Sequence, residues 1–290
     1  MYEPISIRLL KTLLDGKARL TEDSLSKIIG FVESQRTEEY SFKNKSGQAD
    51  IYYTLFGWML SYILGIGMEK RKTAGYLTKQ KPEEMDFVHY SAYMRCSMIK
   101  KLFERGKAGL LLNIFYSDSI KEITDFSIVP NNDMQSPYSQ FLWLSLMEDT
   151  RNRIKNKEEI LGALERYRTP DGGYMNTING KSASTNATVS ALIIKGQLEG
   201  YKPCGDIDYL KDMQEKSGGF SAAEKSPIPD MLSTATSLLA LNCYGVKPKF
   251  PPENFIEAHW LDSGGFSATL LEDKSDIEYT FYGLLALGAL

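Results

Sequence analysis

Two carboxylic acids and one histidine have the residue types and spacing that acid–base chemistry needs. Asp86 and His89 are three residues apart, so a helix that begins at Asp86 would place both in its first turn. The imidazole of His89 titrates near neutral pH and can give or accept a proton, and Glu278 adds a carboxylic acid from a distant part of the chain. The same pattern also fits a role without chemistry, in which Asp86 caps a helix and His89 packs or faces solvent. We take these three residues as catalytic candidates and keep the capping alternative open.

Aromatic side chains form a second group of candidates, for ligand binding rather than proton transfer. They lie at the second, third and sixth positions of several predicted helices, which share one helical face. We expect this face to bind a ligand through Tyr52, Tyr53, Phe56, His89, Tyr138, Leu142, Tyr279 and Tyr282. The corresponding residues of two further helices are small, namely Asn186, Ala187, Ser190, Ser233 and Thr236. A cavity that is aromatic on one side would suit an apolar or planar ligand with a few polar groups, although such stripes also form ordinary packed cores.

The composition excludes several classes of protein. Of 290 residues, 42% are hydrophobic and 24% are charged, which is typical of a globular chain. The net charge is -3 and the basic residues are scattered among acidic ones, so we expect no nucleic-acid partner. No apolar run reaches the roughly 20 residues that a transmembrane helix requires. The N-terminal segment carries acids and bases, which predicts an amphipathic helix rather than a secretion signal.

The cysteines indicate the compartment. Cys96, Cys204 and Cys243 are an odd number without CxxC spacing, which argues against a disulfide framework and against a cysteine-rich zinc site. We therefore expect a reducing environment and a cytoplasmic protein, with no bound cofactor.

A repeat of 46 residues indicates how these side chains are positioned. Three Gly-Gly-aromatic turns end at Tyr174, Phe220 and Phe266, which are spaced 46 residues apart. Ten residues after each aromatic comes a residue that favours helix N-caps, and fourteen after it comes a threonine: Ser184, Asp230 and Asp276, then Thr188, Thr234 and Thr280. A fixed period of this length is typical of stacked helical units.

Three weaker copies extend the repeat toward the N-terminus. They are anchored at Tyr40, Tyr76 and Phe126, with the N-cap position filled by Asp50, Asp86 and Ser136. Each copy predicts a helical hairpin, and outer helices are expected over residues 22–35, 157–167 and 207–216. Six hairpins that close into a ring leave no exposed end. We therefore predict one all-α domain over residues 1–290, an α6/α6 toroid.

Two stretches carry a family resemblance. The run from Gly264 through Asp276 and Thr280 to Leu287 resembles the closing repeat of protein prenyltransferase β subunits. The pattern Gln214-x-x-x-Gly218-x-Phe220 is similar to the QW repeat of squalene cyclases, with phenylalanine in place of tryptophan. The resemblance implies an α/α toroid with a central funnel, into which the aromatic face described above would point.

The motifs that carry chemistry in those relatives are mostly replaced. The resemblance places the prenyltransferase zinc ligands Asp, Cys and His at Asp230, Leu232 and Tyr279, so only the aspartate is kept. We therefore expect no metal. Of the basic residues that hold the diphosphate in that family, Lys225 is the one candidate, and neither the DxDD nor the DDxxD motif of terpene cyclases occurs.

Three hypotheses for function follow. In the first, the funnel binds an isoprenoid, lipid or other hydrophobic molecule without zinc. In the second, the chain is a carbohydrate-active toroid enzyme that pairs Glu278 with Asp86 or Asp276. In the third, it is an interaction module that docks a protein partner through its rim or through an N-terminal helix with an apolar face of Ile5, Leu9, Leu10, Leu13 and Leu14.

Overall fold

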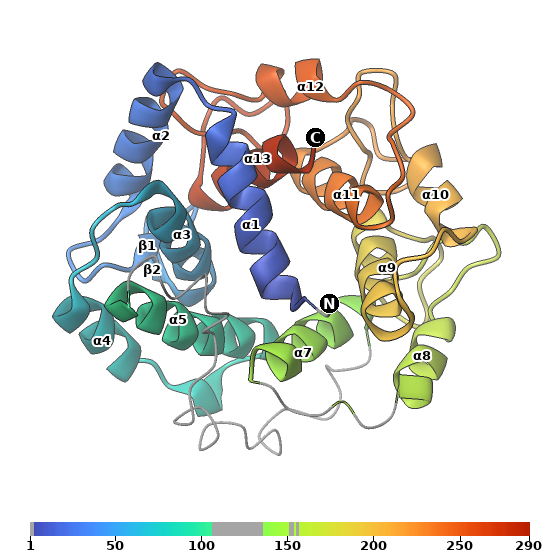
Figure 1. The fold of residues 1–290 in the computed structure, drawn as a ribbon, viewed down its shortest axis with the longest axis horizontal. Helices are drawn as coiled ribbons and strands as arrows, with labels where there is room; N and C mark the ends of the chain where they lie inside the picture. Colours follow the sequence, from blue (N-terminus) through green and yellow to red (C-terminus); the bar gives the residue numbers. More distant parts are fainter. Residues whose placement is uncertain (1–2, 106–135, 151–153, 155–156) are drawn as a thin grey trace.

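Six inner helices form a closed ring. The computed structural model describes residues 3–105, 136–150, 154 and 157–290. Its inner helices are α3 (Ile51–Leu64), α5 (Phe87–Arg105), α7 (Pro137–Asp149), α9 (Thr185–Glu199), α11 (Met231–Cys243) and α13 (Ile277–Ala289). Each helix contacts the next along the chain and α13 contacts α3, which closes the ring (Figure 1). The predicted α/α toroid is therefore confirmed.

Five further helices of the described residues lie outside this ring. They are α2 (Glu22–Gln35), α4 (Lys70–Thr78), α8 (Lys157–Glu165), α10 (Asp206–Asp212) and α12 (Glu253–Ala258) (Figure 1). A 3-10 turn (Pro82–Glu84) precedes α5, and two short antiparallel strands, β1 (Phe42–Lys43) and β2 (Ala49–Asp50), precede α3. The outer helix expected over residues 22–35 is confirmed at both ends. Those expected to reach residues 167 and 216 end earlier, because the chain turns into the bridges Arg168–Tyr174 and Gln214–Phe220.

Every inner helix in the ring begins at a side-chain cap. Asp50, Asp86, Ser136, Ser184, Asp230 and Asp276 each accept a hydrogen bond from a backbone N–H of the first turn, at 2.8 to 3.2 Å. These bonds satisfy donors that a helix start otherwise leaves unpaired. The capping role predicted for the repeated Asp and Ser is confirmed.

A second hydrogen bond fixes the turn before the helix. The backbone N–H groups of Tyr174, Phe220 and Phe266 donate to a threonine Oγ1 fourteen residues later, at 2.9 to 3.3 Å. In the first repeat the equivalent donor is Phe42, whose N–H bonds Thr54 Oγ1 at 2.9 Å. The predicted anchor at Tyr40 is therefore corrected to Phe42. The β1–β2 hairpin makes this connection two residues shorter, so Phe42 lies eight residues before the N-cap instead of ten.

The second and third anchors differ as well. Tyr76 lies inside the outer helix α4, and is not part of a bridge before α5. The short 36-residue spacing of this repeat leaves room for a 3-10 turn in place of the Gly-Gly loop. The predicted anchor at Tyr76 is therefore corrected, while Phe126 lies outside the described residues.

One additional helix, α1 (Ile5–Ala18), covers an end of the ring (Figure 1). Its Leu10 and Leu13 are completely buried. Its first turn is held by α7, because the Ile5 N–H donates to Glu148 Oε2 at 2.8 Å and Ser6 Oγ donates to Asp149 Oδ2 at 2.6 Å. The apolar face of this helix is therefore used inside the fold and does not form the partner-docking surface considered from sequence.

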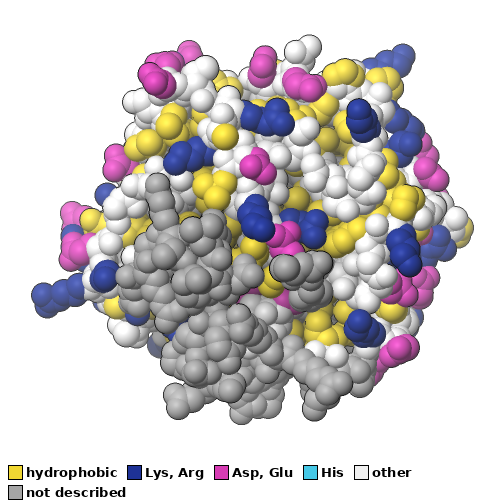
Figure 2. Space-filling model, in the orientation of Figure 1, with side chains coloured by type: hydrophobic (Ala, Val, Ile, Leu, Met, Phe, Trp, Pro, Cys, Tyr) yellow, Lys and Arg dark blue, Asp and Glu magenta, His cyan; other side chains and the backbone are white. Residues whose placement is uncertain are grey.

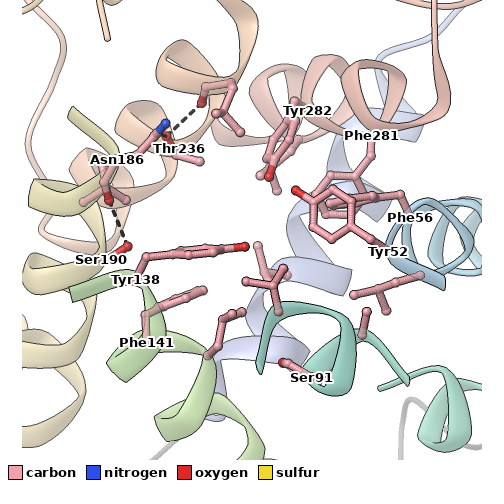
Figure 3. Close-up of a pocket in the computed structure, with 18 of the residues that line it drawn as sticks. Tyr52, Phe56, Ser91, Tyr138, Phe141, Asn186, Ser190, Thr236, Phe281 and Tyr282 are labelled. Carbon is pink, nitrogen blue, oxygen red and sulfur yellow. Dashed lines mark hydrogen bonds between the residues drawn. The ribbon is translucent and has the colours of Figure 1, made fainter. Parts of the chain in front are cut away.

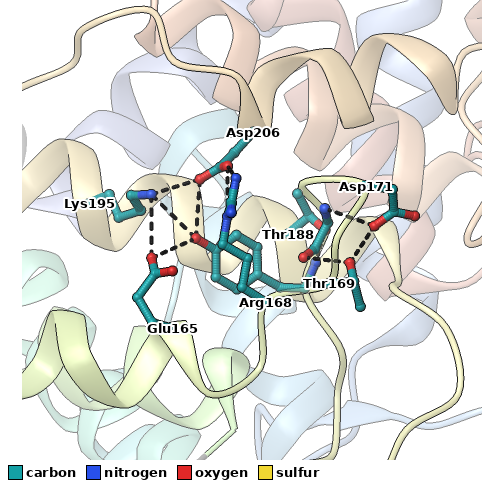
Figure 4. Close-up of polar contacts among 9 residues, drawn as sticks. Glu165, Arg168, Thr169, Asp171, Thr188, Lys195 and Asp206 are labelled. Carbon is teal, nitrogen blue, oxygen red and sulfur yellow. Dashed lines mark hydrogen bonds and ion pairs between the residues drawn. The ribbon is translucent and has the colours of Figure 1, made fainter.

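Neighbouring repeats are also joined by an ion-pair cluster outside the ring (Figure 4). Asp206 of α10 is buried and accepts from Arg168 Nε and Nη2 at 3.0 and 2.6 Å and from Lys195 Nζ at 2.7 Å. Burial alone would raise the pKa of Asp206, but the bonds from Lys195 and Arg168 lower it. The cluster ties α9 to the connections on either side of it.

Where described residues form the face shown in Figure 2, which is the face that α1 covers, Lys and Arg are interspersed with Asp and Glu. Within the described ranges, no helix combines the length and the apolar character that crossing a bilayer demands.

Candidate functional site

A cavity of about 380 Å³ lies at the centre of the ring. All six inner helices contribute to its wall, and Leu9 of α1 lines it as well. The lining residues of each helix are drawn from the second, fifth, sixth and ninth positions after its N-cap, which form one face. Because α1 packs against the C-terminal half of α13, the ninth positions form the deep layer of the cavity and the N-caps lie at the opposite end.

The wall is aromatic on one side and lined by small polar residues on the other (Figure 3). Tyr52 and Phe56 of α3 lie beside Phe281 and Tyr282 of α13. The ring centroid of Phe56 is 4.9 Å from those of Tyr52 and Phe281 and 5.7 Å from that of Tyr282. Across the cavity, Thr236 Oγ1 donates to Asn186 Oδ1 at 3.2 Å, and Ser190 lies one turn along α9. The cavity thus presents aromatic rings to one part of an occupant and hydroxyl and amide groups to another.

The structure brings five of the eight predicted ligand-binding residues to this wall and leaves three outside it. The five are Tyr52, Phe56, Tyr138, Leu142 and Tyr282. Tyr53, His89 and Tyr279, all at the third helical position, are not part of the wall. One residue further along a helix turns the side chain by about 100°. Two of the three positions chosen from sequence therefore face the cavity and the third faces away.

Tyr52 and Glu278 form the clearest polar contact at the end where the helices begin. Tyr52 Oη donates to Glu278 Oε1 at 2.7 Å. Burial raises the pKa of Glu278, and the hydrogen bond from Tyr52 opposes that rise. Burial also raises the pKa of Tyr52 far above its ordinary value, so the phenol keeps its proton. The pair offers a carboxyl group of weakened acidity next to the aromatic wall, although Glu278 itself is not part of the wall.

Asp86 and His89 lie close to this pair. The His89 ring centroid is 6.5 Å from that of Tyr52, and His89 Nδ1 lies 2.8 Å from both carboxylate oxygens of Asp86. Burial would raise the pKa of Asp86, but the hydrogen bonds from the His89 amide and ring lower it. Both side chains are more than 40% exposed. The three catalytic candidates therefore gather around Tyr52, one with a raised and one with a lowered carboxyl pKa.

Comparison with known proteins now gives the family. A family model described as the prenyltransferase alpha-alpha toroid domain matches residues 5–226. The chain belongs to this family. Among solved structures, it is similar to a chain of Candida albicans protein geranylgeranyltransferase-I complexed with GGPP, with a TM-score of 0.61 and 12% identity over 91% of this chain and 90% of that one. At this identity the likeness shows the fold alone. Comparison with curated protein sequences finds no match.

The positions that resemble the prenyltransferase zinc ligands do not fit zinc in this member of the family. Both oxygens of Asp230 are occupied by Ser233, whose N–H and Oγ donate at 2.8 and 2.7 Å. Leu232 lines the cavity and has no donor atom, and the Tyr279 ring lies under Lys45 Nζ at 4.9 Å. In the part of the chain that the structure describes, no three His, Cys, Asp or Glu side chains gather as a metal would require.

Sequence reasoning missed part of the wall. Phe141 and Phe281 occupy the fifth helical position, and Ser91 and Arg95 add polar groups from α5. Arg95 left a signal in the sequence. The ninth position after the N-cap is apolar in four other repeats, with Met59, Ile193, Leu239 and Leu285, and charged only in α5.

Proposed function

We propose that the central cavity binds an isoprenoid or another hydrophobic small molecule. The observation that carries this proposal is the cavity itself, whose volume of about 380 Å³ falls within the range of ligand pockets. Its wall is mostly aliphatic and aromatic with a few polar groups, as such pockets usually are. The similar fold of the geranylgeranyltransferase chain, whose structure contains GGPP, gives further support.

An ordinary packed core explains the aromatic side chains less well. Protein interiors are packed about as densely as organic crystals, and voids larger than a water molecule are few. Here each inner helix buries its other faces, with Trp58, Leu60, Leu144 and Leu192 at 2% exposure or less, while one face is left lining a space. The central space is thus a consequence of ring closure and not of poor packing.

The occupant would bind without the zinc-dependent step of protein prenylation. That step uses the metal to activate an acceptor thiol, and Leu232 and Tyr279 supply neither thiolate nor imidazole. The five aromatic and aliphatic residues placed on the wall, Tyr52, Phe56, Tyr138, Leu142 and Tyr282, would contact the apolar body.

The experiment is a binding measurement with matched variants. Farnesol and geranylgeraniol are added to the purified chain, and native mass spectrometry and the shift in melting temperature report binding. Ser190→Trp projects an indole into the cavity and should abolish the shift, whereas Ser182→Trp, at an exposed position just before α9, should leave it intact. Thr236→Phe fills the same space from α11 and serves if Ser190→Trp does not fold. Absence of binding to the unmodified chain, or equal binding by the cavity-filling variants, would contradict the proposal.

The carbohydrate-active alternative has less support from the geometry. Its proposed carboxyl groups, Glu278 with Asp86 or Asp276, are not part of the cavity wall, and Asp276 is occupied as the cap of α13. The opposite pKa directions of Glu278 and Asp86 are what such an enzyme would need. Hydrolysis of any member of a glycan panel, lost in Glu278→Gln, would favour it.

We also propose a reducing compartment. Cys96, Cys204 and Cys243 are free thiols that form no disulfide. Cys96 is fully buried, and desolvation raises the pKa of its thiol. Docking of a protein partner at the rim of the ring stays a prediction.

A further inference from the structure

One charged side chain lies in the apolar wall of the cavity. Arg95 lines the cavity from α5 and is only 8% exposed. It occupies the ninth helical position, where Met59, Ile193 and Leu239 line the same layer. Burying a guanidinium away from water is costly unless a counter-charge or hydrogen-bond acceptors compensate it. A cavity that needed only to hold a neutral hydrocarbon would gain nothing from this arginine.

Two of its nitrogens have no acceptor. Among the described residues, Arg95 Nε and Nη2 are buried without a hydrogen-bond partner. These two nitrogens form one edge of the guanidinium, and that edge suits an acidic oxygen or a pair of them. Arg168 uses the same edge on Asp206, with Nε and Nη2 at 3.0 and 2.6 Å from Oδ1 (Figure 4). The edge that is filled in Arg168 is therefore empty in Arg95.

A hydroxyl lies one helical turn before this edge. Ser91 lines the cavity, is 1% exposed, and its Oγ has no partner in the described part of the chain (Figure 3). Residues four apart on a helix lie on one face, so Ser91 and Arg95 present their donors to the same part of the cavity. Tyr138 lines the same cavity, and the positive charge of Arg95 opposes the rise that burial causes in the pKa of Tyr138.

The buried carboxylate of Asp149 does not fill this role. Burial raises the pKa of Asp149 to about 6, and the positive charge of Arg95 opposes the rise. Its Oδ2 accepts from Ser6 Oγ at 2.6 Å and its Oδ1 has no partner among the described residues. Arg95 is thus close enough to act on Asp149 through charge, but its free edge makes no bond to it.

We propose that Arg95 and Ser91 bind the anionic group of an amphipathic ligand, a carboxylate or a phosphate, whose apolar body fills the aromatic part of the cavity. This inference rests on the proposed binding function and narrows it from hydrophobic molecules in general to hydrophobic acids. The site lies on α5, across the ring from the connection before α11 where the prenyltransferase resemblance places Lys225. The head group would therefore lie in the deep layer, beside α1 and α7, with the chain directed toward Tyr52 and Phe56.

The test compares an isoprenoid carboxylic acid with the alcohol of the same chain length. Isothermal titration of the whole chain is expected to give tighter binding of the acid. Arg95→Met, which gives α5 the residue type found at position nine of α3, should weaken acid binding by about ten-fold to a hundred-fold, the effect of losing a hydrogen-bonded charge, and so lower the ratio of acid to alcohol affinity. Arg95→Lys keeps the charge and should recover part of the preference for the acid, and Ser91→Ala should lose part of it. Arg168→Met removes a paired arginine outside the cavity and should leave the ratio of acid to alcohol affinity unchanged.

The other outcomes separate this inference from the proposal beneath it. If the alcohol and the acid bind equally and Arg95→Met changes neither, the cavity binds hydrophobic molecules and the anion site is wrong. If neither binds, both the proposed function and this inference are wrong. Acetate or inorganic phosphate that protects the fold as strongly as the long-chain acid would show a site for free anions and overturn the amphipathic ligand. If Arg95→Met lowers stability without altering the affinity ratio, Arg95 only compensates Asp149. Should the methionine variant not fold, an unchanged affinity ratio in Ser91→Ala would overturn the anion site.

Discussion

Substituting Gly16 with alanine tests how closely α1 is packed onto the ring. A Cβ at Gly16 would lie 2.0 Å from the Leu284 carbonyl oxygen of α13, about 1 Å short of the closest approach that Cβ atoms make. The contact is made from both sides, because a Cβ at Gly288 would lie 1.8 Å from the Thr12 carbonyl oxygen. Both obstacles are backbone atoms within helices, which do not move aside as a flexible side chain would. Alanine at Gly16 must therefore push the two helices apart.

The expected cost is worked from two opposing effects. Replacing a helical glycine with alanine gains about 0.5–1 kcal/mol through backbone entropy. Forcing an extra methyl group into a packed interface costs about 1–3 kcal/mol, and here it also loosens the packing of Leu10 and Leu13, two fully buried residues of α1. We expect Gly16→Ala to lower the free energy of unfolding by about 1–2 kcal/mol, and hydrogen exchange to show faster exchange of the α1 amides.

Gly30 provides the matched control. It lies in α2, is exposed, and has no atom within 4 Å of the position that a Cβ would take. Gly30→Ala should therefore stabilise the chain by about 0.5–1 kcal/mol. Urea unfolding followed by circular dichroism measures both variants. Stabilisation of similar size in both would refute the close α1–α13 contact, and with it the assignment of α1 to the floor of the cavity.

Three further predictions concern the repeat, the buried carboxyl group and the metal. Thr234→Val removes the acceptor of the buried Phe220 N–H and should cost about 1–3 kcal/mol, while the exposed Thr78→Val should stay within about 0.5 kcal/mol of the parent in the same urea titration. Because the pKa of Asp149 is raised to about 6 in the folded chain, the native state holds this proton more tightly than the unfolded state does. The contribution of Asp149 to stability therefore falls as pH rises from about 4 to 6. Asp149→Asn should remove this part of the pH dependence of the unfolding free energy, measured across that range. Elemental analysis of the chain purified without added metal should find no stoichiometric zinc. Asp230→Ala should lower the free energy of unfolding by about 1 kcal/mol, because the cap of α11 is lost. One zinc per chain that is lost in this variant would contradict the prediction.

The sequence predicted the fold correctly where every repeat uses the same residue types for the same structural role. Every inner helix needs a cap, so Asp or Ser recurs at one position, and the last three turns need a threonine acceptor at another. The predicted anchor of the first repeat was wrong, because the connection between the aromatic residue and the helix is shorter there. Phe42 makes the same bond to Thr54 across a shorter connection, and a fixed count from the N-cap therefore selected Tyr40 instead.

The sequence predicted the site less well, because the rotation of each helix about its own axis decides which side chains line the cavity. The third position after the cap was assigned to the cavity from the resemblance, yet Tyr53, His89 and Tyr279 lie outside the wall while Phe141 and Phe281 at the fifth position form part of it. The contacts around Tyr52 join α3, α5 and α13, and no spacing along the chain predicts which rings of three helices meet. Only the ring geometry supplies that information.

Framework positions and cavity positions differ in how constant they are among the six repeats. The cap is Asp or Ser in all six copies and the threonine recurs in four, because these residues do equivalent work in different copies. Most residues at the second, fifth, sixth and ninth positions line one shared space, so each copy can contribute a different side chain to a single occupant. A different residue at a framework position lowers stability, because the fold loses a cap or a hydrogen bond. A different residue at a cavity position changes only what the cavity binds. Arg95 breaks the pattern at a cavity position, which is the reason to look for its counterpart in a ligand rather than in the fold.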